Sequence, residues 1–219
     1  MVGQALMLPE NLLKKRLHQL LKFTKFIIKI MIEIILASKS QVRKDILNSN
    51  KIYCDVIPSN IDEDSVKLSL SKENASPEAV SKNLAELKAN KISAKFNNKL
   101  VIGADSVIDL NGKIISKPTN RVEALDILKS LNGKTHFLIS SVCISKDGNM
   151  IWNYSDKAKL TMKNFSDEEL ELYLSKISDK DLYAYNVYQI EGEGKKLFSE
   201  IEGDKNSIMG FQLTKLKII

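Results

Sequence analysis

The chain contains 219 residues, of which 43% are apolar, and it carries a formal net charge of +6. This length and composition suit one medium-sized domain with a sizeable core, alone or with an appendage. The two cysteines, Cys54 and Cys143, exclude a disulfide framework and are expected to be buried thiols in a reducing compartment. His18 and His136 lie too far apart to suggest a histidine-based metal centre. Any metal would therefore need carboxylate ligands, which favour Mg²⁺ or Mn²⁺ over Zn²⁺.

The positive charge is concentrated at the N-terminus, where residues 1–32 hold six lysines and arginines against one acidic residue, Glu10. The remainder is nearly neutral, so the basic balance gives no support for a nucleic-acid-binding face on the main domain. We interpret residues 1–31 as a basic extension, helical or disordered, in front of a main domain at residues 32–219.

Apolar residues of the extension recur at helical spacing, which indicates an amphipathic helix. They are Leu13, Leu17, Leu20, Leu21, Ile27, Ile28 and Met31. Lysines interrupt every window long enough to span a membrane, and the pattern of a secretory signal is missing, so we expect no stable membrane insertion. Two interpretations remain: a helix at a protein surface or membrane interface, and an upstream segment without a folded role, the domain starting at Met31. We favour the second.

Beyond the extension, strands and helices alternate. The pattern predicts a strand at 34–37, a helix at 40–48 and a strand at 53–57. Ser76 and Pro77 then mark the start of a long helix that reaches about residue 95, because serine caps a helix and proline fits its first position.

Residue pairs typical of tight turns and helix caps punctuate the second half of the chain. The turn pairs are Asn111-Gly112, Asn132-Gly133 and Asp147-Gly148; the pairs resembling capping boxes are Asn120 with Glu123 and Ser166 with Glu169. Long strands are predicted at 135–146 and 150–162, and a shorter return strand ends near residue 116. The mixture predicts an α/β (α+β) single domain with a mixed, partly antiparallel, twisted sheet flanked by helices and a cleft at the strand ends.

The segment 100–108 is an apolar strand that carries a single carboxylate, Asp105, between an alanine and a serine. Burying a carboxylate without a partner costs roughly several kcal/mol of folding free energy, so the side chain needs a cation or a hydrogen-bond donor beside it. Asp105 is therefore a candidate metal ligand or general base. The alternative is a strand-end aspartate that accepts backbone hydrogen bonds.

The first strand leads into a small, hydroxyl-rich turn that contains Ser38 and then into a helix. Free backbone N–H groups and the helix dipole make such a junction an anion site. Arg43, one turn into the helix, is placed to bind a phosphate in a forked geometry. The alternatives are that Ser38 only caps the helix and that Arg43 is a solvated side chain.

Three further charged residues are predicted near the same region. Lys117 precedes a proline at the end of the hairpin, where the backbone is extended. By topology, Lys88 lies on the helix that faces the same region, and Glu63 follows a strand as a second carboxylate. Each is more often a surface charge, but together they are what a metal-assisted attack on a polyphosphate requires.

Six motifs stand out between residue 34 and about residue 213. They are LASKSQVRKDIL (36–47), IDE (61–63), LAELKA (84–89), VIGADSVIDLNGKIISKP (101–118), LNGKTHFLISSV (131–142) and EGDKNSIMGFQL (202–213). In these motifs the chain resembles the Maf (septum formation) family of nucleoside triphosphate pyrophosphatases.

The resemblance implies a cytoplasmic, often dimeric enzyme that splits the α–β phosphoanhydride of a nucleoside triphosphate with the help of Mg²⁺ or Mn²⁺. By matching positions, Asp105 would accept the proton of the attacking water and touch the metal, with Glu63 as a second acidic ligand. The remaining matched residues would hold the triphosphate; they are Ser38, Arg43, Lys88 and Lys117.

Two departures from the family pattern bear on substrate choice. Gln41-Val42 stands where the family usually has proline and arginine, so one phosphate-facing arginine is missing. The stretch 183–194 places Glu191 where a substrate-binding glutamine usually lies, and its EGxG ending resembles branches that include an enzyme for 7-methylguanosine triphosphate more than the dTTP/UTP branch.

Three functions compete at this point. The first is an enzyme that clears unwanted or modified nucleoside triphosphates. The second is a nucleotide-binding regulator of cell division with little turnover, which the missing arginine permits. The third, a membrane-associated basic helix, rests only on residues 10–30. The retained carboxylates favour the enzyme, because a binder has no need for anions beside a phosphate.

Overall fold

The computed structural model describes residues 11, 14–22, 33–190, 192–213 and 215. The chain divides into two compact units, residues 1–33 and 34–219, each described by itself. In the first unit, residues 14–22 are helical, and Leu17, Leu20 and Leu21 are exposed. The other apolar positions predicted for this helix lie outside the described residues. No helix within the described ranges combines the length and apolar character that crossing a membrane would need.

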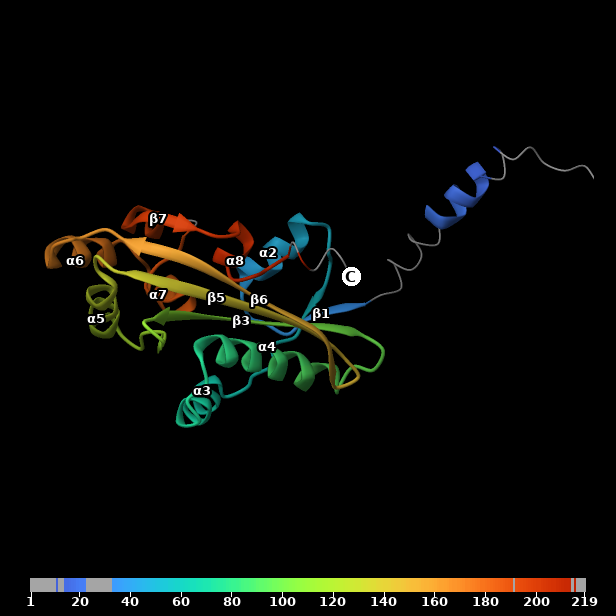
Figure 1. Cartoon of the computed structure of the whole chain (residues 1–219), viewed down its shortest axis with the longest axis horizontal. Helices are drawn as coiled ribbons and strands as arrows, with labels where there is room; N and C mark the ends of the chain where they lie inside the picture. Colours follow the sequence, from blue (N-terminus) through green and yellow to red (C-terminus); the bar gives the residue numbers. More distant parts are fainter. Residues whose placement is uncertain (1–10, 12–13, 23–32, 191, 214, 216–219) are drawn as a thin grey trace, which may run out of the picture. The chain divides into compact units, whose positions relative to one another are not determined.

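The second unit contains a mixed sheet and helices, shown in Figure 1. Its strands are β1 (Ile34–Leu36), β2 (Asp55–Val56), β3 (Leu100–Leu110), β4 (Lys113–Ile115), β5 (Thr135–Lys146), β6 (Asn149–Met162) and β7 (Phe198–Glu202). Its helices are α2 (Gln41–Ser49), α3 (Glu63–Lys72), α4 (Pro77–Ser93), α5 (Arg121–Leu131), α6 (Asp167–Ser175), α7 (Asp179–Tyr185), the 3₁₀ helix η1 (Glu193–Leu197) and α8 (Lys205–Ile208).

The sheet confirms the mixed α/β architecture. Its strand order is β2-β1-β3-β5-β6-β7, and β4 pairs with β3. The pairs β1–β2 and β1–β3 are parallel, whereas the other pairs are antiparallel. The strand β1 pairs with β3 only as far as Leu36 opposite Ile102, so β3 continues beyond the end of its parallel neighbour. A cleft at this edge follows from the topology, as it does in many open sheets with parallel strands.

Alternate residues of β1 and β3 face opposite sides of the sheet, and a different helix covers each side. Ile35 and Val101 pack with Ala85 and Ala89 of α4 in one core cluster. Leu36 and Ile102 pack with α2 and with the C-terminal segment that holds Phe211 in another. Figure 1 shows α4 and α2 on opposite sides of these strands. A third cluster lies among α5, α6 and the adjoining strands.

Several local predictions are confirmed. Ser76 caps α4, with Pro77 at its first turn, and the helix ends at Ser93, close to the expected end. Ser166 and Glu169 form the capping box predicted for α6. The turn glycines Gly112, Gly133 and Gly148 all have positive φ, which explains why glycine follows asparagine or aspartate there.

Other predictions need correction. Glu123 does not complete a capping box with Asn120, because its carboxylate accepts from the backbone and hydroxyl of Thr119 instead. The strand expected at 53–57 is reduced to Asp55–Val56. Both cysteines are free thiols, but only Cys143 is buried, whereas Cys54 is half-buried.

Candidate active site

A cleft of about 560 Å³ opens where β1 and β2 end and β3 continues. Ser38, Arg43, Glu63, Lys88, Asp105 and Lys117 all line it. The structure therefore brings together every described residue that the sequence predicted for the site, from five separate segments of the chain. Glu191, the remaining candidate, lies outside the described residues.

Asp105 and Lys88 form the buried centre of this cleft. Asp105 is 4% exposed and Lys88 is 6% exposed. Asp105 points to the α4 side of β3, where its Oδ1 accepts a hydrogen bond of 2.7 Å from the Lys88 ammonium. The other carboxylate oxygen, Oδ2, is buried without a hydrogen-bond partner among the described residues. Asp105 is thus paired with a cation, not with backbone donors, and keeps one oxygen available.

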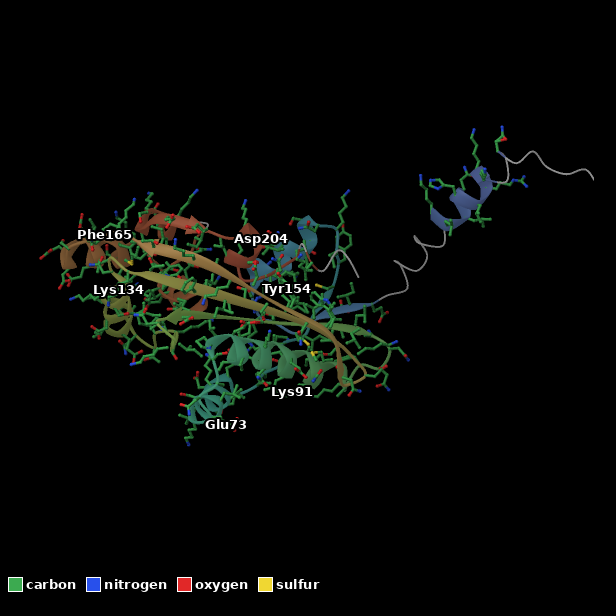
Figure 2. All side chains as sticks on the ribbon, in the orientation of Figure 1. Glu73, Lys91, Lys134, Tyr154, Phe165 and Asp204 are labelled. Atoms are coloured by element: carbon green, nitrogen blue, oxygen red, sulfur yellow. The ribbon has the colours of Figure 1, made fainter. Side chains whose placement is uncertain are left out.

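Glu63 completes a carboxylate–lysine–carboxylate bridge. The Lys88 ammonium lies 2.8 Å from Glu63 Oε1 and 2.7 Å from Asp105 Oδ1. Glu63 is the first residue of α3, a helix that the sequence did not predict and that Asp62 caps. Lys91, labelled in Figure 2, donates from α4 to the carbonyl of Asn60 at 3.0 Å and so holds the loop before α3.

The two carboxylates differ in acidity because their burial differs. Burial raises the pKa of Asp105, and the nearby Lys88 only partly opposes this effect. Burial also disfavours the charged form of Glu63, but the attraction and hydrogen bond of Lys88, with the charges of Lys67 and Lys117, together outweigh it, so the pKa of Glu63 falls below its usual value. One carboxylate is therefore the better base and the other the better permanent anion.

The close approach of α4 to β3 sets the position of Lys88. Gly103 makes this approach possible, because a Cβ there would lie 2.1 Å from the carbonyl oxygen of Ala85 and 2.7 Å from the nitrogen of Ala89. The Ser81 hydroxyl also donates to the carbonyl of Asp105 at 3.3 Å. The glycine of the GAD motif is thus required for the contact between helix and strand that joins Lys88 to Asp105.

Arg43 is bound by groups of the protein itself and is not the solvated side chain that was one alternative. It makes four hydrogen bonds within the protein, to the Gly210 carbonyl (3.0 Å), Ser38 Oγ (3.1 Å), the Ala104 carbonyl (2.9 Å) and Ser106 Oγ (3.2 Å). A guanidinium has five N–H donors, so most of its capacity is used internally. Burial lowers the pKa of Arg43, with Asp105 and Glu63 opposing. The side chain joins β3, the Ser38 turn and the C-terminal segment.

The Ser38 turn has the hydrogen bonding expected at the start of a helix. Ser38 Oγ accepts from the backbone of Ser40 at 3.2 Å, and Ser40 in turn caps α2. Ser38 is buried, and its hydroxyl is already engaged by Arg43 as well. The turn is therefore a preformed cradle whose shape depends on Arg43.

The cleft carries a strong excess of positive charge. Its lining includes five lysines and Arg43 against Glu63 and Asp105 as the carboxylates; the lysines are Lys39, Lys67, Lys88, Lys117 and Lys180. Desolvation by the surrounding protein atoms lowers the pKa of Lys117, although the residue is exposed. The positive charge of Arg43 lowers this pKa further. A positively charged cleft with two carboxylates at its base suits a polyanion that also brings a cation.

One end of the cleft is apolar. Ile108, Ile114, Ile115, Leu138, Tyr188 and Ile190 line it, beside the amides of Asn186 and Gln189. Sequence reasoning missed these residues and the lysines Lys39, Lys67 and Lys180, because single apolar residues and lysines are common at surfaces and give no motif. Tyr188 is fixed by a hydrogen bond of 2.8 Å to His136 Nε2, the buried histidine of the LNGKTH motif.

No group of three or more histidine, cysteine or acidic residues within the described ranges forms a ready-made metal site. Two carboxylates, one with an unpartnered buried oxygen, nevertheless fit Mg²⁺ or Mn²⁺. Mg²⁺ in particular is commonly held by one or two carboxylates together with substrate phosphates and waters. The donor set fits a metal that arrives with a phosphate ligand.

Comparison with known proteins places this site in a family. The family model described as Maf-like protein matches residues 33–218. The chain belongs to the Maf family. The family match includes the whole cleft, from the Ser38 turn to the C-terminal segment that contacts Arg43.

Two curated Maf-family relatives illustrate the likeness. A protein of Pelagibacter ubique named nucleoside triphosphate pyrophosphatase is 71% identical over 185 residues, which are 84% of this chain and 95% of the relative. A Rhizobium etli protein named 7-methyl-GTP pyrophosphatase is 35% identical over 184 residues, or 84% of this chain and 92% of the relative. Among solved structures, the Staphylococcus aureus Ham1 protein aligns with 62% of this chain and 72% of its own, with 18% identity and a TM-score of 0.38.

Proposed function

We propose that this Maf-family protein hydrolyses a nucleoside triphosphate at the α–β phosphoanhydride, releasing a nucleoside monophosphate and pyrophosphate and so removing unwanted or modified nucleotides. The observation that carries the proposal is the buried Asp105 at the base of a cationic cleft: one of its oxygens is paired with Lys88, and the other has no hydrogen-bond partner among the described residues. The names of the relatives, nucleoside triphosphate pyrophosphatase and 7-methyl-GTP pyrophosphatase, point to the same reaction.

The charges of the cleft match the proposed substrate. A nucleoside triphosphate carries a compact row of negative charges, and the lysines and Arg43 exceed the carboxylates in the cleft lining by four. The apolar end beside Tyr188 suits the flat, less polar base. Lys117 and the N-terminus of α2 support the phosphates, through charge-assisted hydrogen bonds and backbone N–H groups respectively.

In the proposed reaction Asp105 takes a proton from a water molecule. Its unpartnered Oδ2 is the acceptor, and burial raises the pKa of Asp105, which makes it a stronger base than a solvated carboxylate. The oxygen of that water bonds to the α-phosphorus as the bond from this phosphorus to the bridging oxygen breaks. The electron pair of the broken bond leaves with pyrophosphate, whose charge the lysines of the cleft neutralise.

A divalent metal fits this site. We infer that Asp105 and Glu63 would hold Mg²⁺ or Mn²⁺ together with the substrate phosphates. When bound, the ion would neutralise charge on the phosphates and on the leaving group. In the nucleotide-free protein, Lys88 holds Asp105 and Glu63 in position.

A pyrophosphate-release assay over common and modified nucleoside triphosphates, including 7-methyl-GTP, dTTP, UTP and CTP, tests this proposal. It is run with Mg²⁺, with Mn²⁺ and with a chelator. Release of pyrophosphate and the matching monophosphate from at least one substrate supports it. Tight nucleotide binding without turnover under every condition would instead favour the regulator of cell division.

We propose that the protein is cytoplasmic and forms a homodimer. Free thiols at Cys54 and Cys143 agree with the cytoplasm, where thiols are kept reduced. The homodimer expected from the family resemblance is tested by the sedimentation-equilibrium mass of the purified chain.

A further inference from the structure

Lys88 bridges the two carboxylates of the cleft. Its ammonium lies 2.8 Å from Glu63 and 2.7 Å from Asp105, the two carboxylates proposed to hold the metal. A cation is therefore already placed between the metal ligands in the nucleotide-free protein. No third carboxylate, histidine or cysteine joins them within the described residues to bind an ion more strongly.

The packing of α4 holds the backbone of Lys88 in place. It is 6% exposed, and α4 is seated so closely on β3 that Gly103 has no room for a Cβ. Leu84, Ala85 and Ala89 around it on the helix are fully or almost fully buried in the core. The only freedom left to the ammonium is that of its own four-carbon stem, which reaches the cleft lining.

A divalent ion entering the nucleotide-free site would meet two costs. It would displace Lys88 from one or both charge-assisted hydrogen bonds, and it would lie close to a positive charge that the fold keeps nearby. Like charges a few ångströms apart repel strongly where water is largely excluded. A bound triphosphate removes both costs, because its oxygens offer the ammonium new partners and its charge offsets both cations.

We propose that Lys88 is a built-in counter-ion that competes with the divalent metal for Glu63 and Asp105, so that the metal binds together with the nucleotide and not before it. This inference rests on the proposed function. It assigns Lys88 two partners in turn: the carboxylates in the free protein and the phosphates in the loaded one. The carboxylates are thereby kept in place in the nucleotide-free protein.

The test measures Mn²⁺ binding by calorimetry and by the loss of the free-ion electron paramagnetic resonance signal, at pH 8 and without turnover. For the wild-type chain we expect weak binding without nucleotide. In the presence of a triphosphate analogue with a methylene group between the α- and β-phosphorus, binding to the protein–analogue complex should be on the order of tenfold tighter or more, after correction for binding to the analogue alone. Equal affinity with and without the analogue would overturn the proposal.

The substitution Lys88→Met removes the charge and keeps the apolar stem. We expect it to raise the Mn²⁺ affinity of the nucleotide-free protein by about tenfold or more. The matched control is Lys82→Met, on the same helix, where the lysine pairs with Glu78 at 2.8 Å at the surface; it should leave the affinity unchanged. Unchanged or weaker Mn²⁺ binding in a folded Lys88→Met protein would contradict the proposal.

Circular dichroism and a thermal melt show whether Lys88→Met folds, and if it does not, Lys88→Gln, which also removes the charge, takes its place. These readouts do not depend on catalysis. A chain that binds Mn²⁺ as expected but releases no pyrophosphate from any triphosphate would refute the proposed function and leave the competition intact. A chain that turns over but shows the same metal affinity in both titrations would refute only the competition.

Discussion

At the scale of single residues, the pleat of β3 directs the neighbours Asp105 and Ser106 to opposite faces of the sheet, where they have different partners. Asp105 faces α4 and meets Lys88, whereas Ser106 faces the other side and accepts from Arg43 at 3.2 Å. Adjacent side chains of a strand point to opposite faces. The GADS sequence therefore supplies a proposed base on one side of the sheet and an anchor for Arg43 on the other.

Replacing Asp105 with asparagine should abolish hydrolysis while nucleotide binding stays the same or improves. The amide keeps the shape of the carboxylate but cannot accept a proton, and loss of a general base typically lowers rates by about 10² to 10⁴. Steady-state pyrophosphate release checks the loss of hydrolysis, and equilibrium binding of a triphosphate checks the retained affinity. Equal turnover in Asp105→Asn and wild type would remove Asp105 from its proposed role.

His136 should make the free energy of unfolding depend on pH. It is fully buried, and burial lowers its pKa from 6.5 to about 4. A group with a depressed pKa in the folded state contributes stability above its unfolded pKa, and this contribution is lost as the pH falls from 6.5 through 4. The shift corresponds to about 3 kcal/mol. Urea unfolding at pH 7 and pH 4.5 should show a larger loss for wild type than for His136→Gln, and equal losses would contradict the assignment.

At the scale of elements, contacts between distant segments shape the cleft. The bond from Arg43 to the Gly210 carbonyl joins α2 to the C-terminal segment, 167 positions apart. Ser140 of β5 extends this network, since its hydroxyl lies 3.0 Å from that of Ser106 and donates to the Ser207 carbonyl at 2.8 Å. The phosphate cradle at the start of α2 thus depends on elements far away in the chain.

Arg43→Ala and Lys117→Ala should therefore behave differently. Arg43→Ala leaves the carbonyls of Ala104 and Gly210 without this donor, which costs about 1 to 3 kcal/mol each where they are buried. It should lower both the melting temperature and the activity. Lys117→Ala, at an exposed position, should raise KM or lower kcat with an unchanged melting temperature. A lowered melting temperature for Lys117→Ala, together with an unchanged one for Arg43→Ala, would contradict this prediction.

Gly103→Ala should separate α4 from β3. The added Cβ would lie 2.1 Å from the Ala85 carbonyl oxygen, so the helix must shift, and overpacking of this kind costs about 1 to 3 kcal/mol. Because Lys88 moves with the helix, activity should fall by more than the loss of folded protein accounts for. Chemical denaturation combined with assays at a temperature where the variant is folded measures both. Wild-type stability together with wild-type kcat would show that the close contact is unnecessary.

At the scale of the whole molecule, the site lies entirely within the second unit. The family match begins at residue 33, and the site residues begin at Ser38. Residues 14–22 form a separate helix with four lysines and arginines and with exposed leucines. The two units carry different properties: the cleft belongs to one and a basic helix to the other.

Removing residues 1–30, so that the chain starts at Met31, should leave kcat/KM and the melting temperature essentially unchanged. None of the matched site residues is lost, because all of them follow β1. Pyrophosphate release, a thermal melt and sedimentation with anionic vesicles are measured for both chains. A truncated chain that precipitates, loses activity or no longer binds vesicles that the full chain binds would give the extension a role of its own.

The sequence by itself determined the local structure of this protein and the types of residue in its site. Ser76-Pro77, Asn111-Gly112 and Ser166 with Glu169 predicted their caps and turns correctly, because such signals depend on a few neighbouring residues. The apolar pattern of β3 was equally clear, and it pointed to Asp105. Short elements such as α8, of four residues, left no periodicity to read.

Only the tertiary structure decided which residues meet. The bridge from Lys88 to Asp105 and Glu63 depends on how closely α4 lies on β3, and the internal use of Arg43 depends on where the C-terminal segment returns. The apolar end of the cleft likewise gathers residues of several elements around Tyr188. These contacts join positions far apart in the chain, and packing sets their distances, whereas sequence patterns report only on what lies within a few residues.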